Sequence, residues 1–207
     1  MRCLVPVAVD SPKSRLAPVL SPSDRRAFSC AMAVDVLSTL RAADCHPTVL
    51  ATAPIDDDRI ASSLRVDVDD RPLSEAINAR LVDGKPTLVV MADLPLIEPQ
   101  DIRQLTDSDS DITIAPGLGG GTNALAVREP SFRVDYHGCS YRDHCRVADE
   151  LAASVGVIDS RRLATDVDEP ADLAEVLIHS DGTAASWLTA AGFELDTTDG
   201  RVGIVRR

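Results

Sequence analysis

The stretch TLVVMADLPLI, residues 87–97, begins as an apolar run and then meets one carboxylate, Asp93, before Leu-Pro-Leu. Gly84 and Pro86 precede the run and Pro95 interrupts it, a pattern typical of a strand buried on both faces inside a parallel sheet. Pro95 has no N–H to donate to a ladder, so the strand cannot simply continue. Open α/β sheets bind ligands at the carboxyl ends of their strands. We therefore expect Asp93 at a strand tip that faces a crevice.

Strand-like and helix-like segments alternate around this stretch. Apolar and β-branched runs predict further strands at residues 2–9, 48–52, 65–68, 111–115 and 124–127. Helical spacing and capping residues predict helices at residues 21–41, 56–64, 73–81 and 99–106. Ser21 is the expected N-cap of the first helix, because Pro22 follows it at the first helical position. The alternation predicts a three-layer α/β/α protein with a mostly parallel sheet.

The last third of the chain carries further elements. Residues 166–168 are expected to end a strand, and Pro170 to lie near the start of the following helix. Helices are also expected at residues 140–153, with Ser140 as a candidate cap, and at residues 183–191. Residues 193–205 predict a hairpin turned at Asp199 and Gly200. Because nothing in the 207 residues resembles a long linker, we expect one domain, 1–207, with a C-terminal helix and hairpin.

The composition restricts the partners and the location. The formal net charge is -12, and only two of the 21 basic residues are lysine, Lys13 and Lys85. Such a surface repels nucleic acid and is typical of a halophile, whose salt screens the self-repulsion. No signal peptide and no apolar run of about 20 residues is present, so we expect a soluble, cytoplasmic protein with no membrane partner. Five scattered cysteines without a C-x-x-C pair predict reduced thiols.

Several segments offer groups that could bind a metal and phosphates. Lys13 and Arg15 lie in the first loop, three consecutive glycines lie at residues 119–121, and acids follow at Asp166 and Asp168. Magnesium often takes one or two protein carboxylates and completes its shell with water and substrate phosphates. Cations and backbone N–H groups can hold phosphate oxygens. Together with Asp93 the set indicates phosphoryl or nucleotidyl transfer. Each segment alone is also typical of a helix cap, a flexible turn or a surface ion pair.

Other metal and nucleotide motifs are not supported. Two histidines and two cysteines, His137, Cys139, His144 and Cys145, gather near residue 140, but their spacing matches no common structural zinc pattern. We therefore expect a helix start with packed thiols here and not a zinc site. The glycine run does not fit G-x-G-x-x-G before a helix, and no G-x-x-x-x-G-K-[ST] occurs. These absences argue against a dinucleotide-binding fold and a P-loop.

Five motifs spread over nearly the whole length are PKSRL at 12–16, MADLPL at 91–96, GGGTNAL at 119–125, G-x-S-[YF]-x-x-H at 138–144 and DVDEPADL at 166–173. With them the chain resembles the archaeal 2-phospho-L-lactate guanylyltransferase family, within the nucleotidyltransferases of GT-A-like, nucleotide-diphospho-sugar transferase-like fold. MADLPL and DVDEPADL are shared by many nucleotidyltransferases. GGGTNAL and the G-x-S segment narrow the resemblance to the family.

The resemblance implies a reaction and a metal. GMP would pass from GTP to the phosphate of 2-phospho-L-lactate, with release of pyrophosphate, in the assembly of coenzyme F-420. Asp93 and Asp168 would bind Mg²⁺, with Asp166 as the alternative second ligand. Lys13 and Arg15 would hold the triphosphate and stabilise the charge of the leaving pyrophosphate.

The resemblance also implies the remaining contacts and a homodimer. Ser74, where the family pattern has asparagine, would lie near the nucleotide. The phosphorylated acid would be held by Thr122, Gly138 and Ser140, beside Gly120 and Gly121. The attacking phosphate has a second pKa of about 6 and is already ionised, so no general base is expected. Phosphoenolpyruvate, 3-phosphoglycerate or a sugar phosphate as acceptor, CTP as donor, and a non-catalytic nucleotide-binding protein remain alternatives.

Overall fold

The computed structural model describes residues 1–10, 12–62, 64–198, 200 and 202–207. Its central sheet contains the strands β1 (Arg2–Val7), β2 (Pro47–Ala51), β3 (Arg65–Val68), β4 (Thr87–Val90), β5 (Ile112–Pro116), β6 (Thr122–Val127) and β7 (Val155–Val157). A separate antiparallel hairpin consists of β8 (Phe193–Asp196) and β9 (Gly203–Arg206). The helices are α1 (Pro22–Ala42), α2 (Asp58–Ala61), α3 (Leu73–Leu81), α4 (Pro99–Thr106), α5 (Ser140–Glu150), α6 (Arg161–Ala164), α7 (Asp172–His179) and α8 (Thr183–Ala190), with a 3-10 turn, η1, at Ser14–Leu16.

The order of the strands creates a position where a ligand can bind. The sheet order is β3-β2-β1-β4-β6-β5-β7, and β1 pairs in parallel with both β2 and β4. From β1, the strands β2 and β3 follow in order towards one edge of the sheet, whereas β4 lies on the other side of β1. Open α/β sheets bind ligands at the carboxyl ends of strands where the order reverses in this way. The mostly parallel sheet is confirmed, and β6 is its antiparallel strand.

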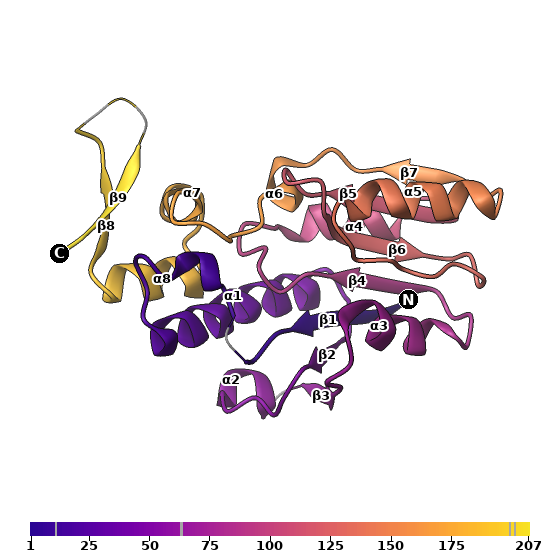
Figure 1. The fold of residues 1–207 in the computed structure, drawn as a ribbon, viewed down its shortest axis with the longest axis horizontal. Helices are drawn as coiled ribbons and strands as arrows, with labels where there is room; N and C mark the ends of the chain where they lie inside the picture. The colour runs from indigo at the N-terminus through magenta and orange to yellow at the C-terminus, as the bar shows by residue number, and fades with distance from the viewer. Residues whose placement is uncertain (11, 63, 199, 201) are drawn as a thin grey trace.

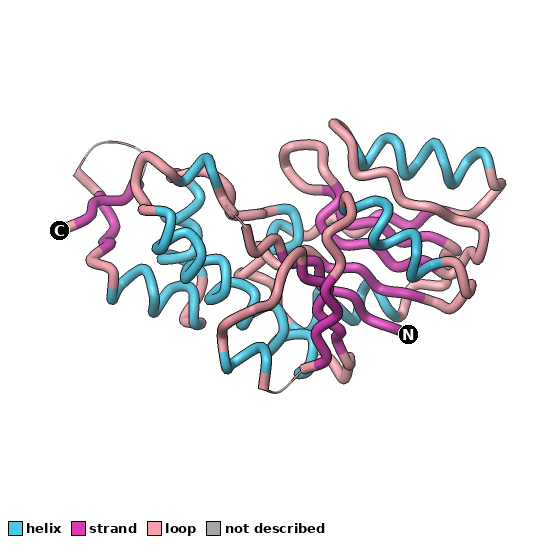
Figure 2. Tube along the Cα trace, turned by 60° about the horizontal axis from the view of Figure 1, so that its bottom comes forward, coloured by secondary structure: helices cyan, strands magenta, loops and turns pink. Residues whose placement is uncertain are grey.

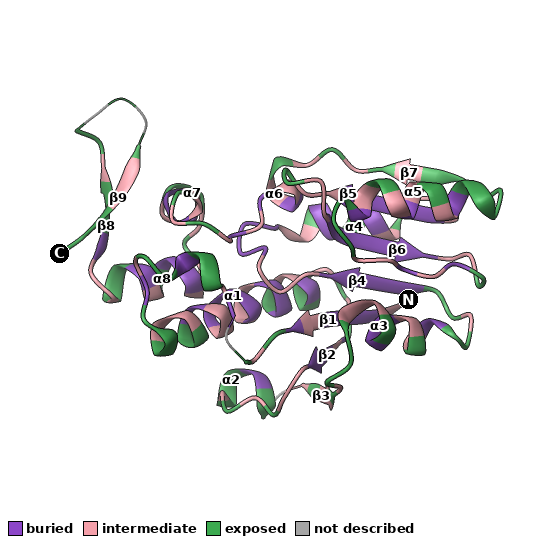
Figure 3. Ribbon diagram, viewed as in Figure 1, coloured by how far each residue is buried: buried purple, intermediate pink, exposed green. Residues whose placement is uncertain are grey.

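Helices cover both faces of the sheet (Figure 1). One hydrophobic cluster packs α1 and α4 against one face and includes Leu88 and Val90 of β4. A second cluster packs α3 and α5 against the opposite face and includes Val89. Successive side chains of a strand point to opposite faces, so β4 is buried on both, as its apolar sequence predicts. Figure 3 shows β4 and β6 as buried strands at the centre of the sheet.

A third cluster joins the C-terminal elements to the start of α1. Phe28 of α1 packs against Trp187 of α8, with ring centroids 5.3 Å apart, and buried Phe193 of β8 belongs to the same cluster. The guanidinium of Arg206 lies 5.1 Å from the centre of the Phe193 ring. The hairpin is therefore anchored on its own chain while its strands project from the body (Figures 1 and 2). The single-domain organisation stays a prediction.

Most predicted elements are present, and several have the predicted bounds. Ser21 caps α1 through a capping box with Asp24: the Ser21 hydroxyl accepts the Asp24 N–H at 3.1 Å, and the Asp24 carboxylate accepts the Ser21 N–H at 3.4 Å. The predicted bounds of β3, α3 and α4 match the structure. The C-terminal hairpin is also present, although Asp199, part of its predicted turn, lies outside the described residues.

Three predictions of local structure are wrong. β4 ends at Val90, so Asp93 lies three residues beyond the strand, in a loop. Residues 165–168 form no strand, because their contact with this loop is a hydrogen bond from Val167 N to Asp93 O (3.0 Å) and not a ladder. Ser140 is the first residue of α5 and not its cap, because the cap position belongs to Cys139.

Two short elements have no sequence signal. β7 has three residues in a partly exposed position, and α6 has four residues with a single buried side chain, Leu163. Neither is long enough to display a period of apolar residues. Among the described residues, no helix has the length and apolarity needed to cross a membrane.

Asp35 of α1 connects the third cluster to the N-terminus of α8. Its carboxylate oxygens accept the backbone N–H groups of Thr183 and Ala184 at 2.6 and 2.8 Å. The first N–H groups of a helix have no partner inside the helix, and an acid there complements the helix dipole. A side chain of one helix therefore caps another helix that lies about 150 residues later in the chain.

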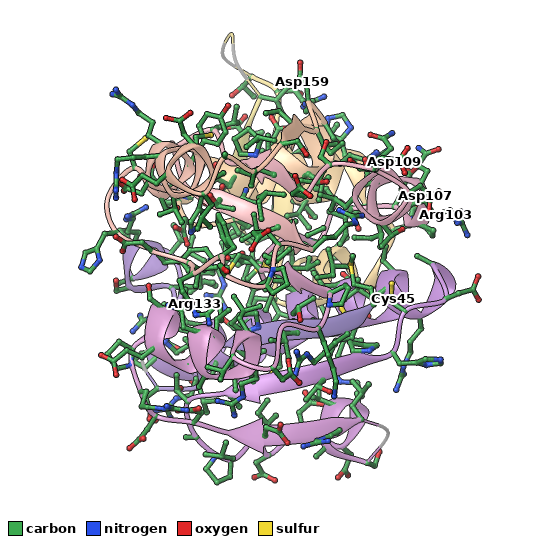
Figure 4. The ribbon with its side chains drawn as sticks, turned by 90° about the vertical axis from the view of Figure 1, so that its right-hand side faces the viewer. Cys45, Arg103, Asp107, Asp109, Arg133 and Asp159 are labelled. Atoms are coloured by element: carbon green, nitrogen blue, oxygen red, sulfur yellow. The ribbon has the colours of Figure 1, made fainter. Side chains whose placement is uncertain are left out.

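We predict that Asp35→Ala lowers the free energy of unfolding by about 1–2 kcal/mol, the usual cost of losing such a cap. The measurement is chemical denaturation at fixed high salt. Asp109 is exposed at the surface (Figure 4), so Asp109→Ala is the matched control and should change stability by less than about 0.5 kcal/mol. Equal losses in the two variants would contradict the capping role.

Candidate active site

Two carboxylates and one ammonium meet beyond the carboxyl end of β4. Lys13 Nζ lies 2.5 Å from Asp93 Oδ2 and 2.5 Å from Asp168 Oδ1. Arg15 reaches the other oxygen of Asp168 at 3.2 Å from the surface, with its side chain 66% exposed. The structure therefore brings together four residues from three segments of the chain. Asp93 and Asp168 lie 80 and 155 positions after Lys13 in the sequence.

The backbone positions each of these groups. Lys13 has φ 54° and ψ 48°, a left-handed conformation that is uncommon outside glycine and that is often found at functional sites. The bond from Val167 N to Asp93 O holds the 165–168 segment against the loop after β4. The carboxylate of Asp172 accepts the N–H groups of Asp168 and Glu169, at 3.0 and 2.7 Å, and fixes the turn into α7.

Lys13 carries its charge in a largely buried position, with its side chain 10% exposed. Burial is the largest influence on the pKa of Lys13 and lowers it, but the charges of Asp93 and Asp168 and the hydrogen bonds to them outweigh burial. The pKa of Lys13 is therefore raised above its ordinary value, and the ammonium stays protonated at neutral pH. Removing such a cation from water costs several kcal/mol, which only close opposite charges offset.

The carboxylate pair suits a divalent cation. Asp93 Oδ1 is buried and has no hydrogen-bond partner among the described residues, so its lone pairs are free to bind a metal ion. Asp93 Oδ2 and Asp168 Oδ1 already contact the ammonium of Lys13. Magnesium prefers oxygen ligands and often uses only one or two carboxylates. No group of three or more His, Cys, Asp or Glu side chains that could hold a metal occurs within the described part of the chain. The donor set therefore fits magnesium shared with a substrate.

Asp166 lies in a different environment from Asp168. Its Oδ1 accepts a hydrogen bond from Asn123 Nδ2 at 3.1 Å, and the same amide nitrogen donates to Leu163 O at 2.9 Å. Asn123 O in turn accepts the N–H of Met91, two residues before Asp93. Asp166 therefore connects β6 to the C-terminal segment, while Asp168 is the acid that shares Lys13 with Asp93.

A cavity of about 310 Å³ opens beside this cluster. It lies at the carboxyl ends of β1, β2 and β4, where the strand order reverses. Its walls are mostly apolar, with polar groups at both ends. The lining residues are Pro6, Val7, Ala8, Pro12, Lys13, Ser29, Met32, Leu50, Thr52, Asp69, Arg71, Leu73, Ala76, Met91, Ala92, Asp93 and Asp168. A mostly apolar cavity with a few convergent polar groups is typical of a small-molecule site.

The predicted acid-binding residues form a second group, at the start of β6 and of α5. Gly120 has φ +83° and a Cβ there would lie 3.1 Å from Cys139 Sγ, so the loop needs glycine at this position. Its carbonyl accepts the Tyr141 N–H at 3.2 Å, which holds the loop against the start of α5. Gly138 has φ +44° and Ser140 is buried in the first turn of α5. These residues, with Gly121, do not line the cavity described above.

Thr122 and His144 are linked inside this second group. His144 Nε2 accepts the backbone N–H of Asp135 at 3.0 Å, so Nε2 carries no proton. The proton of the neutral ring is then on Nδ1, which donates to Thr122 Oγ1 at 2.8 Å. The Thr122 hydroxyl keeps its own hydrogen for another acceptor. Burial lowers the pKa of His144 to about 4, although the charges of Asp135 and Asp143 raise it. His144 is therefore buried and hydrogen-bonded through both ring nitrogens.

Ser74 connects α3 to the loop before α5. Its hydroxyl accepts the N–H of Tyr136 at 2.8 Å, while Leu73 and Ala76 of the same helix line the cavity. The segment around Ser74 therefore lies beside the cavity, but Ser74 itself is not among the lining residues. Its contact with a nucleotide stays a prediction.

Sequence reasoning did not select four polar residues that line the cavity: Ser29, Thr52, Asp69 and Arg71. Asp69 and Arg71 follow β3 directly, so the rule that ligands bind beyond the ends of parallel strands could have indicated them. Ser29 Oγ is buried without a hydrogen-bond partner in the described part of the chain, but nothing in the sequence distinguishes this serine from others in α1.

Comparison with known proteins agrees with this geometry. Residues 1–206 match the family described as "Guanylyl transferase CofC like". The chain belongs to this family. The family resemblance predicted from the five motifs is therefore confirmed, with the match extending over the whole chain except its last residue.

Several proteins named 2-phospho-L-lactate guanylyltransferase are similar to this chain over nearly their full length. The protein of Halorubrum lacusprofundi is 52% identical over 219 residues, which cover all of both chains. The protein of Methanoregula boonei is 43% identical over 205 residues, which cover 98% of this chain and 94% of the relative. Relatives from halophilic archaea agree with the acidic composition.

Solved structures confirm the fold class. A protein from Desulfovibrio desulfuricans G20 assigned as a nucleotide-diphospho-sugar transferase has a TM-score of 0.75 at 14% identity, covering 92% of this chain and 95% of that one. The 2-C-methyl-D-erythritol 4-phosphate cytidylyltransferase of Thermus thermophilus has a TM-score of 0.50 at 16% identity, covering 87% and 99%. The nucleotide-diphospho-sugar transferase-like fold is thus shared.

We predict that His144 makes stability depend on pH. Its folded pKa of about 4 lies below the ordinary value of 6.5, so between these values the unfolded chain binds a proton that the folded chain does not. Stability is therefore lost as pH falls below 6.5, by about 2 kcal/mol between pH 8 and pH 5. His144→Gln removes this contribution. The difference in unfolding free energy between wild type and variant, measured by denaturation, should therefore shrink by that amount as the pH falls from 8 to 5. A difference that stays constant with pH would refute the assignment.

Proposed function

We propose that this protein is a 2-phospho-L-lactate guanylyltransferase, which transfers GMP from GTP to the phosphate of 2-phospho-L-lactate in the biosynthesis of coenzyme F-420. Membership of the guanylyl transferase family supports the proposal. The structural observation that carries it is the convergence of Asp93 and Asp168 on Lys13 at the end of a cavity. The two carboxylates would hold a cation there, and Lys13 and Arg15 would face phosphates.

The proposed reaction is an exchange of one phosphoanhydride bond for another. An oxygen of the 2-phospho-L-lactate phosphate attacks the α-phosphorus of GTP. The bond from this phosphorus to the oxygen that bridges the α- and β-phosphates breaks, and that oxygen leaves with pyrophosphate. Both reactants are anions, so the site must supply positive charge where they meet.

The chain supplies this charge in two ways. Lys13 and Arg15 are proposed to bind the triphosphate and to stabilise the leaving pyrophosphate, and the raised pKa of Lys13 keeps it cationic. When bound, a magnesium ion would add positive charge at the phosphates. Asp93 and Asp168 would hold it, and Asp166 is the alternative to Asp168. The geometry favours Asp168, because Asp166 is bonded to Asn123.

The phosphorylated acid is proposed to bind at the start of α5 and in the glycine loop. The N-terminus of a helix presents unpaired N–H groups and the positive end of its dipole, which favour an anion. Gly138 and Ser140 lie at this N-terminus, and Gly120 and Gly121 lie in the loop that contacts it. The Thr122 hydroxyl has a hydrogen free for an acceptor on the acid.

No residue of the chain is needed as a general base. A phosphate with a second pKa of about 6 is already ionised at neutral pH. Among the described residues no histidine lines the cavity, and His144 is engaged on both ring nitrogens. Binding and charge stabilisation are therefore the tasks of the protein in this reaction.

A homodimer and a cytoplasmic location remain predictions. The described hairpin exposes the apolar residues Leu195, Val202 and Val205, which a second copy could cover. Phe193 and Arg206 anchor the same hairpin to its own chain. Sedimentation or light scattering at high salt would distinguish a dimer from a monomer.

We predict that Asp93→Asn and Asp168→Asn each reduce activity by at least about 100-fold, because each removes a charge that would bind the cation. Asp166→Asn should lose less activity. The measurement is pyrophosphate release from GTP and 2-phospho-L-lactate at saturating magnesium, with unfolding curves to verify that each variant is folded. Exposed Asp159 (Figure 4) gives the matched control, Asp159→Asn, which should keep the wild-type rate. Wild-type turnover by Asp93→Asn would refute the metal assignment.

We predict that the substrate pair is GTP and 2-phospho-L-lactate. Each of the four nucleoside triphosphates would be incubated with magnesium and 2-phospho-L-lactate, phosphoenolpyruvate, 3-phosphoglycerate or a sugar phosphate, and pyrophosphate would be measured. The fastest release should come from GTP with 2-phospho-L-lactate. Faster release with another acid or with CTP would identify a related transferase, and no release with any pair would support a non-catalytic nucleotide-binding protein.

A further inference from the structure

The end of the cavity farthest along the sheet from Lys13 carries a second ionic cluster. Asp69 follows β3 directly, where its N–H bonds to Ala51 O of β2 at 2.8 Å. Its carboxylate accepts Nε and Nη2 of Arg71 at 2.8 and 2.6 Å. Arg80 of α3 bonds to the same carboxylate and also to Ala76 O at 3.1 Å. Two arginines therefore share one carboxylate whose side chain is only 7% exposed.

This arrangement leaves Arg71 as the group available to a ligand. Both oxygens of Asp69 are occupied by arginine donors, and the hydrogen bonds from Arg71 and Arg80 outweigh burial and hold the pKa of Asp69 well below its ordinary value. The side chain of Arg71 is 47% exposed, and its Nη1 has no hydrogen-bond partner among the described residues. A guanidinium fixed through one edge keeps the donors of its other edge in a set direction.

The cluster lies at the distance from the phosphate-binding groups that a nucleotide base requires. Asp93 follows β4, Asp69 follows β3, and β1 and β2 lie between these strands. Three strand intervals of about 4.8 Å amount to roughly 14 Å across the cavity. Apolar side chains of Leu50, Leu73 and Ala76 line the cavity near the Arg71 end. Such walls suit a flat ring that is recognised at its edge.

We propose that Arg71, held by Asp69 and Arg80, binds the O6 and N7 atoms of guanine and makes the site select GTP. These two acceptors match two guanidinium donors, whereas adenine offers N7 beside an amino donor that would face the arginine. The inference rests on the proposed function, since it needs a nucleoside triphosphate with its phosphates at Lys13. It assigns the choice of base to a residue outside the five motifs.

A matched pair in the same strand region tests whether an ordinary ion pair has the same effect. Arg65 bonds Asp67 through Nε and Nη2 with the same two-residue spacing, but its side chain is 75% exposed and it does not line the cavity. Arg65→Ala therefore removes a similar ion pair without touching the proposed base site. Arg71→Ala and Arg71→Gln both remove the guanidinium, so either variant can carry the test.

The experiment measures kcat/KM for pyrophosphate release with four donors: GTP, inosine triphosphate, 7-deaza-GTP, which lacks N7, and 2-aminopurine riboside triphosphate, which lacks O6. Wild type should prefer GTP over the analogue without O6 by roughly 5- to 150-fold, the discrimination of one bidentate pair. Both Arg71 variants should lose activity with GTP and inosine triphosphate and should no longer distinguish GTP from the analogue without O6. Arg65→Ala should behave as wild type.

Direct binding of the same four nucleotides by calorimetry, without the acid, separates the two proposals. Lost base discrimination in the Arg71 variants supports the inference, whether or not turnover follows. Wild type that binds GTP selectively but releases no pyrophosphate would refute the proposed function alone. Arg71 variants that keep the full preference of wild type for GTP would refute the role of Arg71 while leaving the reaction intact.

Discussion

The candidate site depends on one ammonium shared by two carboxylates. Lys13, Asp93 and Asp168 come from three separate segments, and the raised pKa of Lys13 means that its charge persists in a largely buried position. Without Lys13, two acids would face each other at the end of a cavity and would repel. With Lys13, the two carboxylates are held in one orientation before any substrate binds. The free-energy cost of orienting these charged groups is therefore met during folding and does not add to the barrier of the reaction.

The fold determines why these charges meet where they do. The reversal of strand order between β1 and β4 leaves their carboxyl ends without a covering crossover, and the first loop and the loop after β4 occupy this position. The glycine loop and the start of α5 form a neighbouring surface around β6, the antiparallel strand. One sheet thus carries, side by side, the two sites that we propose for the triphosphate and for the phosphorylated acid.

Much of this organisation was predictable, because it depends on local patterns. Ser21, the apolar run of β4 and the periodicity of α3 predict their elements directly, and Asp93 and Lys13 are correctly placed together. Other features depend on tertiary contacts that leave no periodic trace. Asp168 is positioned by the backbone bond from its neighbour Val167 to Asp93 and by its own bond to Asp172, not by a strand. Nothing in the local sequence distinguishes it from Asp166. In the sequence, Arg71 resembles an ordinary turn residue. Only the pairing of β3 with β2 shows that it lies at the cavity.

The hydrogen bond between Val167 and Asp93 also has a consequence for the order of events during folding. Lys13 and Asp93 are 80 residues apart and Lys13 and Asp168 are 155 apart, so the site closes only when the C-terminal third docks on the sheet. Contacts this distant in sequence form late, because long loops must close first. A growing chain on the ribosome would therefore have a complete β1–β4 half and still lack its second acid. Activity therefore requires that the C-terminal third of the chain has folded onto the sheet.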